Sequence, residues 1–188
     1  AFPANVVRVE DYEALGSVRS ISSGTSHTCT VQSQGLLRCW GSNTWGQLGL
    51  NSGSVPMSAA ASPVSSLPLP VIDVALSSSS TCALLSDRSV WCFGRDDFGQ
   101  LGDGIVGNPA HSHLPVQVQS LPGPADRVFG GGDHFCAQLS ADSSVWCWGL
   151  DVYGQLGDGV IGAPNNQPYA APVQGLISPS GPFSDGFE

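Results

Sequence analysis

Short apolar runs broken by turn residues recur along the chain and predict β-strands joined by tight turns. The runs "HTCTV" and "GLLRCWG" flank "QSQ", the runs "TCALL" and "SVWCFG" flank "SDR", and the runs "FCAQL" and "SVWCWG" flank "SADS". Runs of this length bounded by Gly, Ser and Asp are typical of hairpins. No amphipathic helix of useful length is found. The pattern predicts an all-β fold.

The same pattern of hairpin and turn residues occurs three times along the chain. The tetrapeptide Gly-Gln-Leu-Gly begins at Gly46, Gly99 and Gly154, at intervals of 53 and 55 residues. Pro-Val pairs at 63–64, 115–116 and 172–173 keep a similar spacing, and "FPANVV" is a fainter copy at the start. Self-similarity at such a period indicates a repeat architecture. We expect a repeat domain over 1–176 with complete repeats at about 17–63, 71–115 and 124–172, partial repeat strands at both ends, and a flexible tail over 177–188.

Each repeat holds two cysteines, ten or eleven residues apart. In a hairpin with a three-residue turn such as Ser33-Gln34-Gly35, a ten-residue interval places the two cysteines opposite each other, close enough for a disulfide. The expected pairs are Cys29–Cys39, Cys82–Cys92 and Cys136–Cys147. Six buried free thiols are the alternative. Metal binding is disfavoured because no Cys-x-x-Cys occurs. Oxidised pairs would place the protein outside the cytosol.

The segment after the second cysteine of each repeat predicts a tight turn that holds the end of the hairpin in place, and we call it the locking turn. Its glycines allow sharp backbone turns, its leucine is expected to anchor the turn in the core, and its glutamine amide is expected to satisfy main-chain groups of a neighbouring unit. These structural positions are Gly46, Gln47, Leu48 and Gly49, then Gly99, Gln100, Leu101 and Gly102, then Gly154, Gln155, Leu156 and Gly157, together with His27 and His134 earlier in their repeats.

At these residues the chain resembles the repeat family named after the regulator of chromosome condensation, RCC1. "GTSHTC" and "GGDHFC" match the opening of that repeat, and "CWGSNTWGQLGL", "CFGRDDFGQLGDG" and "CWGLDVYGQLGDG" match its close. The second repeat departs from it with "SSSSTC". The resemblance implies a β-propeller with one four-stranded blade per repeat and usually seven blades. The cysteine pairs are similar to those of secreted bacterial members.

Three repeats cannot close a seven-bladed ring. We therefore expect an open or partial propeller: an excerpt of a larger protein, which is favoured, an arc completed by self-association, or a degenerate protein. The resemblance implies that His27 and His134 are buried, hydrogen-bonded structural residues. It also implies, for the eukaryotic members, nucleotide exchange on a small GTPase, and for one propeller type, enzyme inhibition.

Other candidate chemistry is weak. His111 and His113 stand two apart in what reads as a Pro-bounded loop. A calcium site needs six or more converging oxygens, and Asp96, Asp97 and Asp103, echoed by Asp151 and Asp158, fit ordinary turn chemistry better. No acid, base and nucleophile recur together, so no catalytic residue, metal site or cofactor is expected.

Trp45, Phe98 and Tyr153 precede the three Gly-Gln-Leu-Gly turns. Packing between adjacent blades is the preferred interpretation of these aromatic residues. The alternative is a row of anchors for a partner, since aromatic residues are enriched at interfaces. The segments 51–70 and 105–126 read as long loops that differ most between units, which is where recognition is expected in a repeat scaffold.

The charge of the chain limits the classes of partner that we expect. The chain has 15 acidic and 6 basic residues, a net charge of −9, and no lysine. Neutralising a nucleic-acid backbone requires clustered basic residues, so nucleic acid is not expected, and no apolar run is long enough to span a membrane. The sequence predicts a non-enzymatic secreted or cell-surface scaffold, in the periplasm or outside the cell, that binds a protein or surface ligand through its blade loops.

Overall fold

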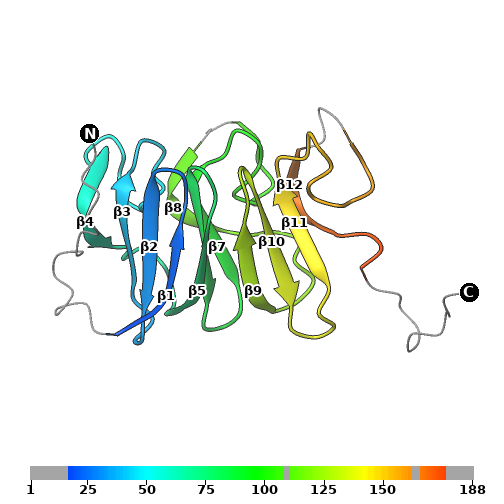
Figure 1. The fold of residues 1–188 in the computed structure, drawn as a ribbon, viewed down its shortest axis with the longest axis horizontal. Helices are drawn as coiled ribbons and strands as arrows, with labels where there is room; N and C mark the ends of the chain where they lie inside the picture. The colour runs from blue at the N-terminus through cyan, green and yellow to red at the C-terminus, as the bar shows by residue number, and fades with distance from the viewer. Residues whose placement is uncertain (1–16, 108–110, 162–165, 177–188) are drawn as a thin grey trace, which may run out of the picture.

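Three four-stranded antiparallel sheets make up the described part of the chain (Figure 1). The computed structural model describes residues 17–107, 111–161 and 166–176, and these ranges contain strands and turns but no helix, so none that could cross a membrane. The first sheet comprises β1 (Val18–Ser23), β2 (His27–Gln32), β3 (Leu37–Ser42) and β4 (Met57–Pro63). The second comprises β5 (Val71–Leu76), β6 (Ser80–Leu85), β7 (Val90–Arg95) and β8 (His111–Gln117). The third comprises β9 (Ala125–Gly130), β10 (His134–Leu139), β11 (Val145–Gly149) and β12 (Gln167–Pro172).

Each sheet is a blade in which neighbouring strands follow each other in the chain. Strand β5 contacts both β1 and β9, so the first strands of the three blades lie beside one another. The last strands β4, β8 and β12 form the opposite edges. Figure 1 shows the three blades side by side in chain order. The all-β blade architecture expected from the sequence is confirmed.

The central hairpins have the predicted register. Cys29 pairs with Cys39 across β2 and β3, and the other two cysteine pairs face each other in the same way. All three disulfides are formed, with Cα atoms 4.1, 4.1 and 4.0 Å apart, and no free cysteine occurs among the described residues. Gly35 has the left-handed conformation expected for the first turn, with φ of 80°. The predicted disulfide pairing is confirmed.

The fourth strands lie in segments that we had expected to be loops. Strand β4 runs within 51–70 and β8 within 105–126. Their sequences "MSAAASP" and "HSHLPVQ" are rich in Ser, Ala, His and Pro and give no strand pattern, but an edge strand tolerates such residues because only one side needs ladder hydrogen bonds. The Pro-Val alignment was also wrong in the second repeat. Opposite the cysteines lie Ser62, Val116 and Ala171, so Gln117 and not Pro115 is equivalent to Pro63.

The hydrophobic core lies between blades. One cluster joins the first and second blades and contains Val31, Leu37, Leu48, Val74, Leu85 and Phe93, and a second joins the second and third blades and contains Leu84, Val90, Leu101, Val128, Phe135 and Trp148. A blade alone is a thin sheet, so each blade buries its apolar faces against its neighbours. The expected partial strands at the chain ends and the tail over 177–188 lie outside the described residues.

Candidate functional site

A buried polar side chain fixes each locking turn, and the sequence analysis did not identify its role. Asn43, Asp96 and Asp151 are buried, and the Oδ1 atom of each accepts a hydrogen bond from the main-chain N–H of the turn leucine, at 2.9, 2.9 and 2.8 Å. Burial raises the pKa of Asp96 to about 7, partly offset by its hydrogen bond from Leu101 and reinforced by the nearby carboxylates of Asp103 and Asp97. These residues are parts of the turn.

The turn glutamines act within their own turns and not, as expected, through the amide on a neighbouring unit. The Oε1 atoms of Gln47, Gln100 and Gln155 accept hydrogen bonds from the main-chain N–H groups two residues earlier, at 2.9, 2.7 and 2.8 Å. The prediction about the amide was wrong because the side chain curls back onto its own turn. The turn leucines Leu48, Leu101 and Leu156 are buried as anchors.

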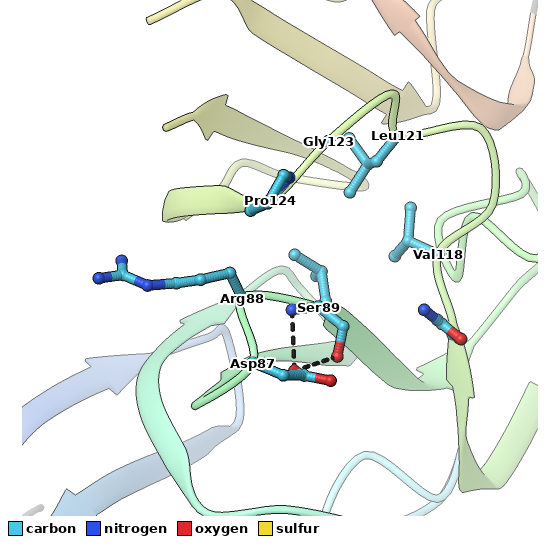
Figure 2. A pocket seen from close by; sticks show the side chains of 9 residues that line it. Asp87, Arg88, Ser89, Val118, Leu121, Gly123 and Pro124 are labelled. Atoms are coloured by element: carbon cyan, nitrogen blue, oxygen red, sulfur yellow. Dashed lines mark hydrogen bonds between the residues drawn. The ribbon is translucent and has the colours of Figure 1, made fainter. Parts of the chain in front are cut away.

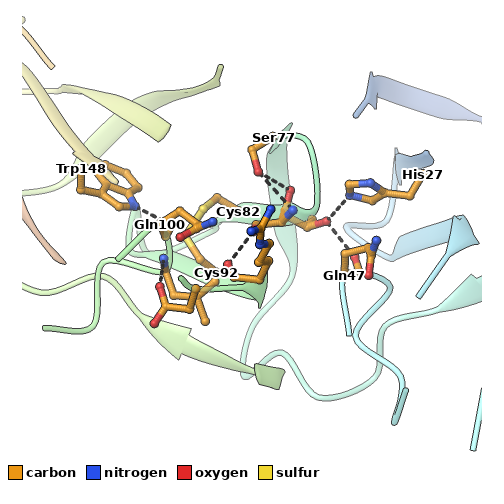
Figure 3. Close-up of a disulfide and its surroundings, with 12 residues drawn as sticks. His27, Gln47, Ser77, Cys82, Cys92, Gln100 and Trp148 are labelled. Carbon is orange, nitrogen blue, oxygen red and sulfur yellow. Dashed lines mark hydrogen bonds between the residues drawn. A yellow bond between two sulfur atoms is a disulfide. The ribbon is translucent and has the colours of Figure 1, made fainter. Parts of the chain in front are cut away.

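The main-chain carbonyl of the glutamine bonds to the next blade (Figure 3). The Thr81 hydroxyl donates to the Gln47 carbonyl at 2.8 Å and lies 2.9 Å from His27 Nε2. The Thr81 hydroxyl has a single proton, which it donates to the carbonyl, so His27 Nε2 must be the donor in the second bond. At the next interface Trp148 Nε1 donates to the Gln100 carbonyl at 3.1 Å. Thr81 and Trp148 are thus different side chains that donate to the equivalent glutamine carbonyl of the preceding blade.

His27 is neutral in the folded protein. It is buried, and burial lowers its pKa to about 4, against a hydrogen bond to the Ser80 main chain that raises it. His134 occupies the equivalent position of the third blade but is only partly buried. Burial also lowers the pKa of His134, while the charges of Asp133 and Asp151 raise it. The hydroxyl that His27 contacts, Thr81 Oγ1, donates its proton to the Gln47 carbonyl, so His27 is not placed to accept that proton as a base.

The three aromatic residues before the turns differ in their surroundings. The Arg95 guanidinium lies 5.2 Å from the Trp45 ring centroid and 5.4 Å from that of Phe98. His111 meets the Trp45 ring edge-on at 5.9 Å, so Trp45 of the first blade packs against the second. Tyr153 is 84% exposed, and no described blade follows it. The geometry favours interblade packing for Trp45.

The acidic residues and the histidine pair do not form a metal site in the described part of the chain, where no three His, Cys, Asp or Glu side chains are placed to hold an ion. His111 and His113 lie at the start of β8 rather than in a loop, and His113 sits against Gly46. Asp103 and Asp158 instead cap the turns that follow, accepting from the main-chain N–H groups of Ile105 and Val160 at 3.0 and 2.9 Å.

Two equivalent pockets lie between blades, at the end of the sheets where the central hairpins turn. One of about 250 Å³ is lined by Asp87, Arg88, Ser89, Leu121 and Pro124 among others (Figure 2). Asp87 accepts two hydrogen bonds from Ser89, which lower its pKa, and Arg88 pairs with Asp126 at 2.9 Å. The other, of about 360 Å³, is lined mainly by Leu, Val and Pro. The polar groups of the first pocket thus bond to neighbouring protein groups, Ser89 to Asp87 and Arg88 to Asp126.

The opposite end carries two loops with exposed aliphatic residues, which we call the rim loops. They follow the locking turns of the second and third blades and present Ile105 with Val106, and Val160 with Ile161, at equivalent places. Main-chain bonds from Gly104 to Pro168 (2.9 Å) and from Gly107 to Asp96 (3.2 Å) tie the first loop down. Exposed apolar side chains on fixed loops are typical of interaction sites.

The chain matches known proteins throughout its repeats. A family model described as the regulator of chromosome condensation (RCC1) repeat matches residues 34–84 and 87–138, and a second model of that description matches 18–47, 71–100 and 126–155. The E3 ubiquitin-protein ligase HERC2 of Mus musculus is 31% identical over 87% of this chain, and the probable E3 ubiquitin-protein ligase HERC4 of Homo sapiens is 30% identical over 82%. The chain spans only 3% and 14% of those two relatives.

Solved structures show the same fold. Human WBSCR16 superposes with a TM-score of 0.74 at 20% identity, over 89% of this chain and 40% of that one. Yeast RCC1 (Prp20), in its complex with Kap60, gives 0.72 at 20% identity, over 85% and 37%. The first family model alone covers more than half of the sequence, and each match of the second model contains one disulfide-linked hairpin and the start of the locking turn after it. This chain belongs to the regulator of chromosome condensation (RCC1) repeat family.

Proposed function

We propose that this chain is a non-enzymatic, exported binding scaffold that holds a protein partner on its rim loops. The observation that carries the proposal is the repetition of an exposed aliphatic pair, Ile105-Val106 and Val160-Ile161, at equivalent places in two consecutive blades. Each pair begins beside a turn capped by an aspartate. Loops held in place lose little conformational freedom on binding, which favours affinity.

Charge supports a protein partner over nucleic acid. The net charge of −9 would repel a phosphate backbone, whereas a protein surface can present apolar side chains to the rim loops. The oxidised cysteine pairs support an extracytoplasmic site of action, because disulfides persist in oxidising compartments. Nucleotide exchange on a small GTPase and enzyme inhibition have no specific observation in their favour. Ligase activity does not follow from relatives of which this chain spans so little.

The test is site-specific photo-crosslinking in the organism that makes the protein. A photoreactive residue at Val106 is expected to capture a protein, while the same residue at Leu36, partly exposed at the opposite end, is expected to capture none. Once the partner is identified, Val106→Asp should weaken its binding at least tenfold because a carboxylate would be desolvated in an apolar contact. Leu36→Asp is the matched control. Equal capture at both positions would rule out the rim loops as the binding site.

Localisation is tested separately. Protein isolated from its source is denatured without reduction and treated with a thiol-alkylating reagent, and its intact mass is measured. We expect no label on any of the six cysteines. Six labelled thiols would contradict the proposed export.

A further inference from the structure

The charged side chains are divided unevenly between the two ends of the sheets. We call the end from which the rim loops leave the rim end, and the end where the central hairpins turn the hairpin end. In the described part of the chain the rim end carries Arg95 and the aspartates Asp96, Asp97, Asp103, Asp133, Asp151 and Asp158, of which Asp96 and Asp151 are buried. At or near the hairpin end, Arg19, Arg38, Arg88 and Arg127 balance Asp73, Asp87, Asp126 and Asp142. The rim end is therefore the acidic end.

Arg95, the one described arginine at the rim end, is already engaged. Its Nε donates to a carboxylate oxygen of Asp97, and its guanidinium lies over two aromatic rings. Asp103 and Asp158, at the start of the two rim loops, are partly exposed, and neither belongs to an ion pair among the described residues. The carboxylates nearest the rim loops are therefore not neutralised by the described chain.

The fold does not require a charge on these two aspartates. Asp103 and Asp158 cap their turns by accepting a hydrogen bond from the main-chain N–H two residues later. In the first blade Asn51 does the same with its amide oxygen, which accepts from the main-chain N–H of Gly53 at 3.0 Å. A neutral amide thus caps a turn of this kind. The charge of the two aspartates is available to a partner.

The charge and the exposed aliphatic pair occur together. The segments "GDGIVG" at 102–107 and "GDGVIG" at 157–162 have the same order of residue types. The corresponding segment of the first repeat, "GLNSGS" at 49–54, has neither the aspartate nor the aliphatic pair. The first blade nevertheless forms four strands and a complete locking turn. A blade therefore folds without either feature, and their joint presence in the other two blades indicates a shared role on the surface.

Tyr169 of the third blade extends the rim loop of the second. A Cβ on Gly104 would lie 2.5 Å from the tyrosine ring, and the Gly104 N–H donates to the Pro168 carbonyl at 2.9 Å, so the ring and the loop are in contact. Tyr169, Ile105 and Val106 are 48%, 44% and 45% exposed. Two neighbouring blades thus present three apolar side chains directly after the turn aspartate.

We propose that the rim loops bind a cationic, apolar segment of a protein, in which lysine or arginine side chains lie next to aliphatic or aromatic ones. The apolar side chains of the segment contact Ile105, Val106 and Tyr169, and its cations lie beside Asp103 and Asp158. The face of the Tyr169 ring also favours a cation. This inference rests on the proposed function, because it names the chemistry of the protein that the rim loops hold.

Charge complementarity decides between kinds of segment. An acidic segment is repelled by Asp103 and Asp158, and a purely apolar segment leaves both carboxylates without a partner. A cationic segment without apolar side chains leaves the aliphatic pairs exposed to water. Only a segment with both kinds of side chain uses every feature that the rim loops repeat.

The test is the binding of three short synthetic peptides to the full chain, measured by titration calorimetry at low salt. The first peptide alternates lysine with leucine, the second has glutamate in place of lysine, and the third has serine in place of leucine. We expect the first peptide to bind at least tenfold more tightly than either of the others, because it alone supplies cations and apolar side chains together. Added salt should weaken its binding, because salt screens the ionic contacts.

Variants that remove charge without removing a cap locate the site. Asp103→Asn combined with Asp158→Asn keeps the oxygen that caps each turn, and we expect the lysine–leucine peptide to bind it about tenfold less tightly, about threefold for each charge. Asp87→Asn combined with Asp142→Asn is the matched control at the hairpin end, where each aspartate accepts from the main-chain N–H of a serine two residues later. The control should change the affinity less than about twofold.

Each contrary outcome has its own meaning. Equal weakening in the rim and control variants would show a general attraction to the net charge of the chain and would overturn the inference. So would the absence of binding of the lysine–leucine peptide up to about 1 mM, the weak end of specific association. Equal binding of the glutamate peptide that is lost in Val106→Ser would also overturn it, but would leave the rim loops as a binding site. Photo-crosslinking at Val106 tests the proposed function without assuming the charge of the partner.

Discussion

At the scale of single residues, the main-chain N–H of the turn leucine donates to an amide oxygen in the first blade and to a carboxyl oxygen in the other two. The first blade uses Asn43, whose Nδ2 donates to the carbonyls of Leu50 and Val55 at 2.9 and 2.6 Å while its Oδ1 accepts from Leu48. The second blade uses Asp96, a carboxyl that accepts from Leu101 but is buried. An amide serves this place without a charge, and a carboxylate serves it at the cost of desolvation.

Asp96 should make stability fall as the pH rises. Its folded-state pKa, about 7, lies above the unfolded value near 3.9, so the folded state binds the extra proton and loses stability between about pH 4 and pH 7. Asp96→Asn should remove this slope and raise the free energy of unfolding by up to about 4 kcal/mol at pH 8, which is about 3 pKa units at about 1.4 kcal/mol each, with little change at pH 4. Urea unfolding at the two pH values measures this. A variant whose slope equals that of the wild type would contradict it.

The reciprocal change is the matched control. Asn43→Asp removes the two bonds that the amide donates to Leu50 and Val55 and places a carboxylate in the same buried turn. We expect a loss of about 2–3 kcal/mol at neutral pH, since buried acceptors lose their donors. A loss of similar size at pH 4, where the new carboxyl is protonated, would indicate that the donated bonds and not the charge dominate.

At the scale of elements, each blade depends on a stapled hairpin. The disulfides join β2 to β3, β6 to β7 and β10 to β11 at opposed positions. The first two disulfides are fully buried in the interblade clusters, whereas Cys136 of the third is partly exposed. The three disulfides therefore lie in similar sequences but differ in how deeply they are buried.

Removal of a staple should reveal that difference. Closing a loop of about ten residues contributes about 2.5–3 kcal/mol. The double variant Cys82→Ala and Cys92→Ala should lose this and more, because it also leaves space in a packed core. The pair Cys136→Ala and Cys147→Ala should lose less. Denaturant unfolding of the two proteins gives the order, and a larger loss in the third blade would contradict this prediction.

At the scale of the whole molecule, stability depends on contacts between blades rather than within them. The Thr81 hydroxyl bonds both to His27 and to the Gln47 carbonyl of the first blade, and all three residues are buried. The second interface depends on Trp148 and Gln100. These bonds join positions about one repeat apart and set the order of the blades.

Thr81→Val keeps the shape of the side chain and removes both bonds. It should lower the free energy of unfolding by about 2 kcal/mol, because a buried N–H and a buried carbonyl are left unpaired. Thr28→Val at the equivalent position, where the hydroxyl lies 3.3 Å from that of Ser23 in an exposed pair, should change it by less than about 0.5 kcal/mol. Equal effects would mean that the interblade bonds contribute nothing to stability.

Local features of this chain were predictable, and the reasons are local. The cysteine register follows from the ten- and eleven-residue intervals, because a hairpin's turn length determines which residues face each other. The left-handed turn at Gly35 follows from the residue type. Strands β4 and β8, by contrast, were not predictable from "MSAAASP" and "HSHLPVQ". They are edge strands, whose residues need neither apolar alternation nor a full ladder of hydrogen bonds.

The hairpins and the disulfide pairing follow from the sequence alone, since each depends on residues within about one hairpin of each other, and the repeat and the family follow from the spaced motifs. Which atoms join the blades is seen only in the folded molecule. His27 and Thr81 are 54 positions apart, and Trp148 and Gln100 are 48 apart. Nothing in either residue type reveals the other, because a bond across an interface depends on how two separately folded sheets are brought together, which only the packed blades specify.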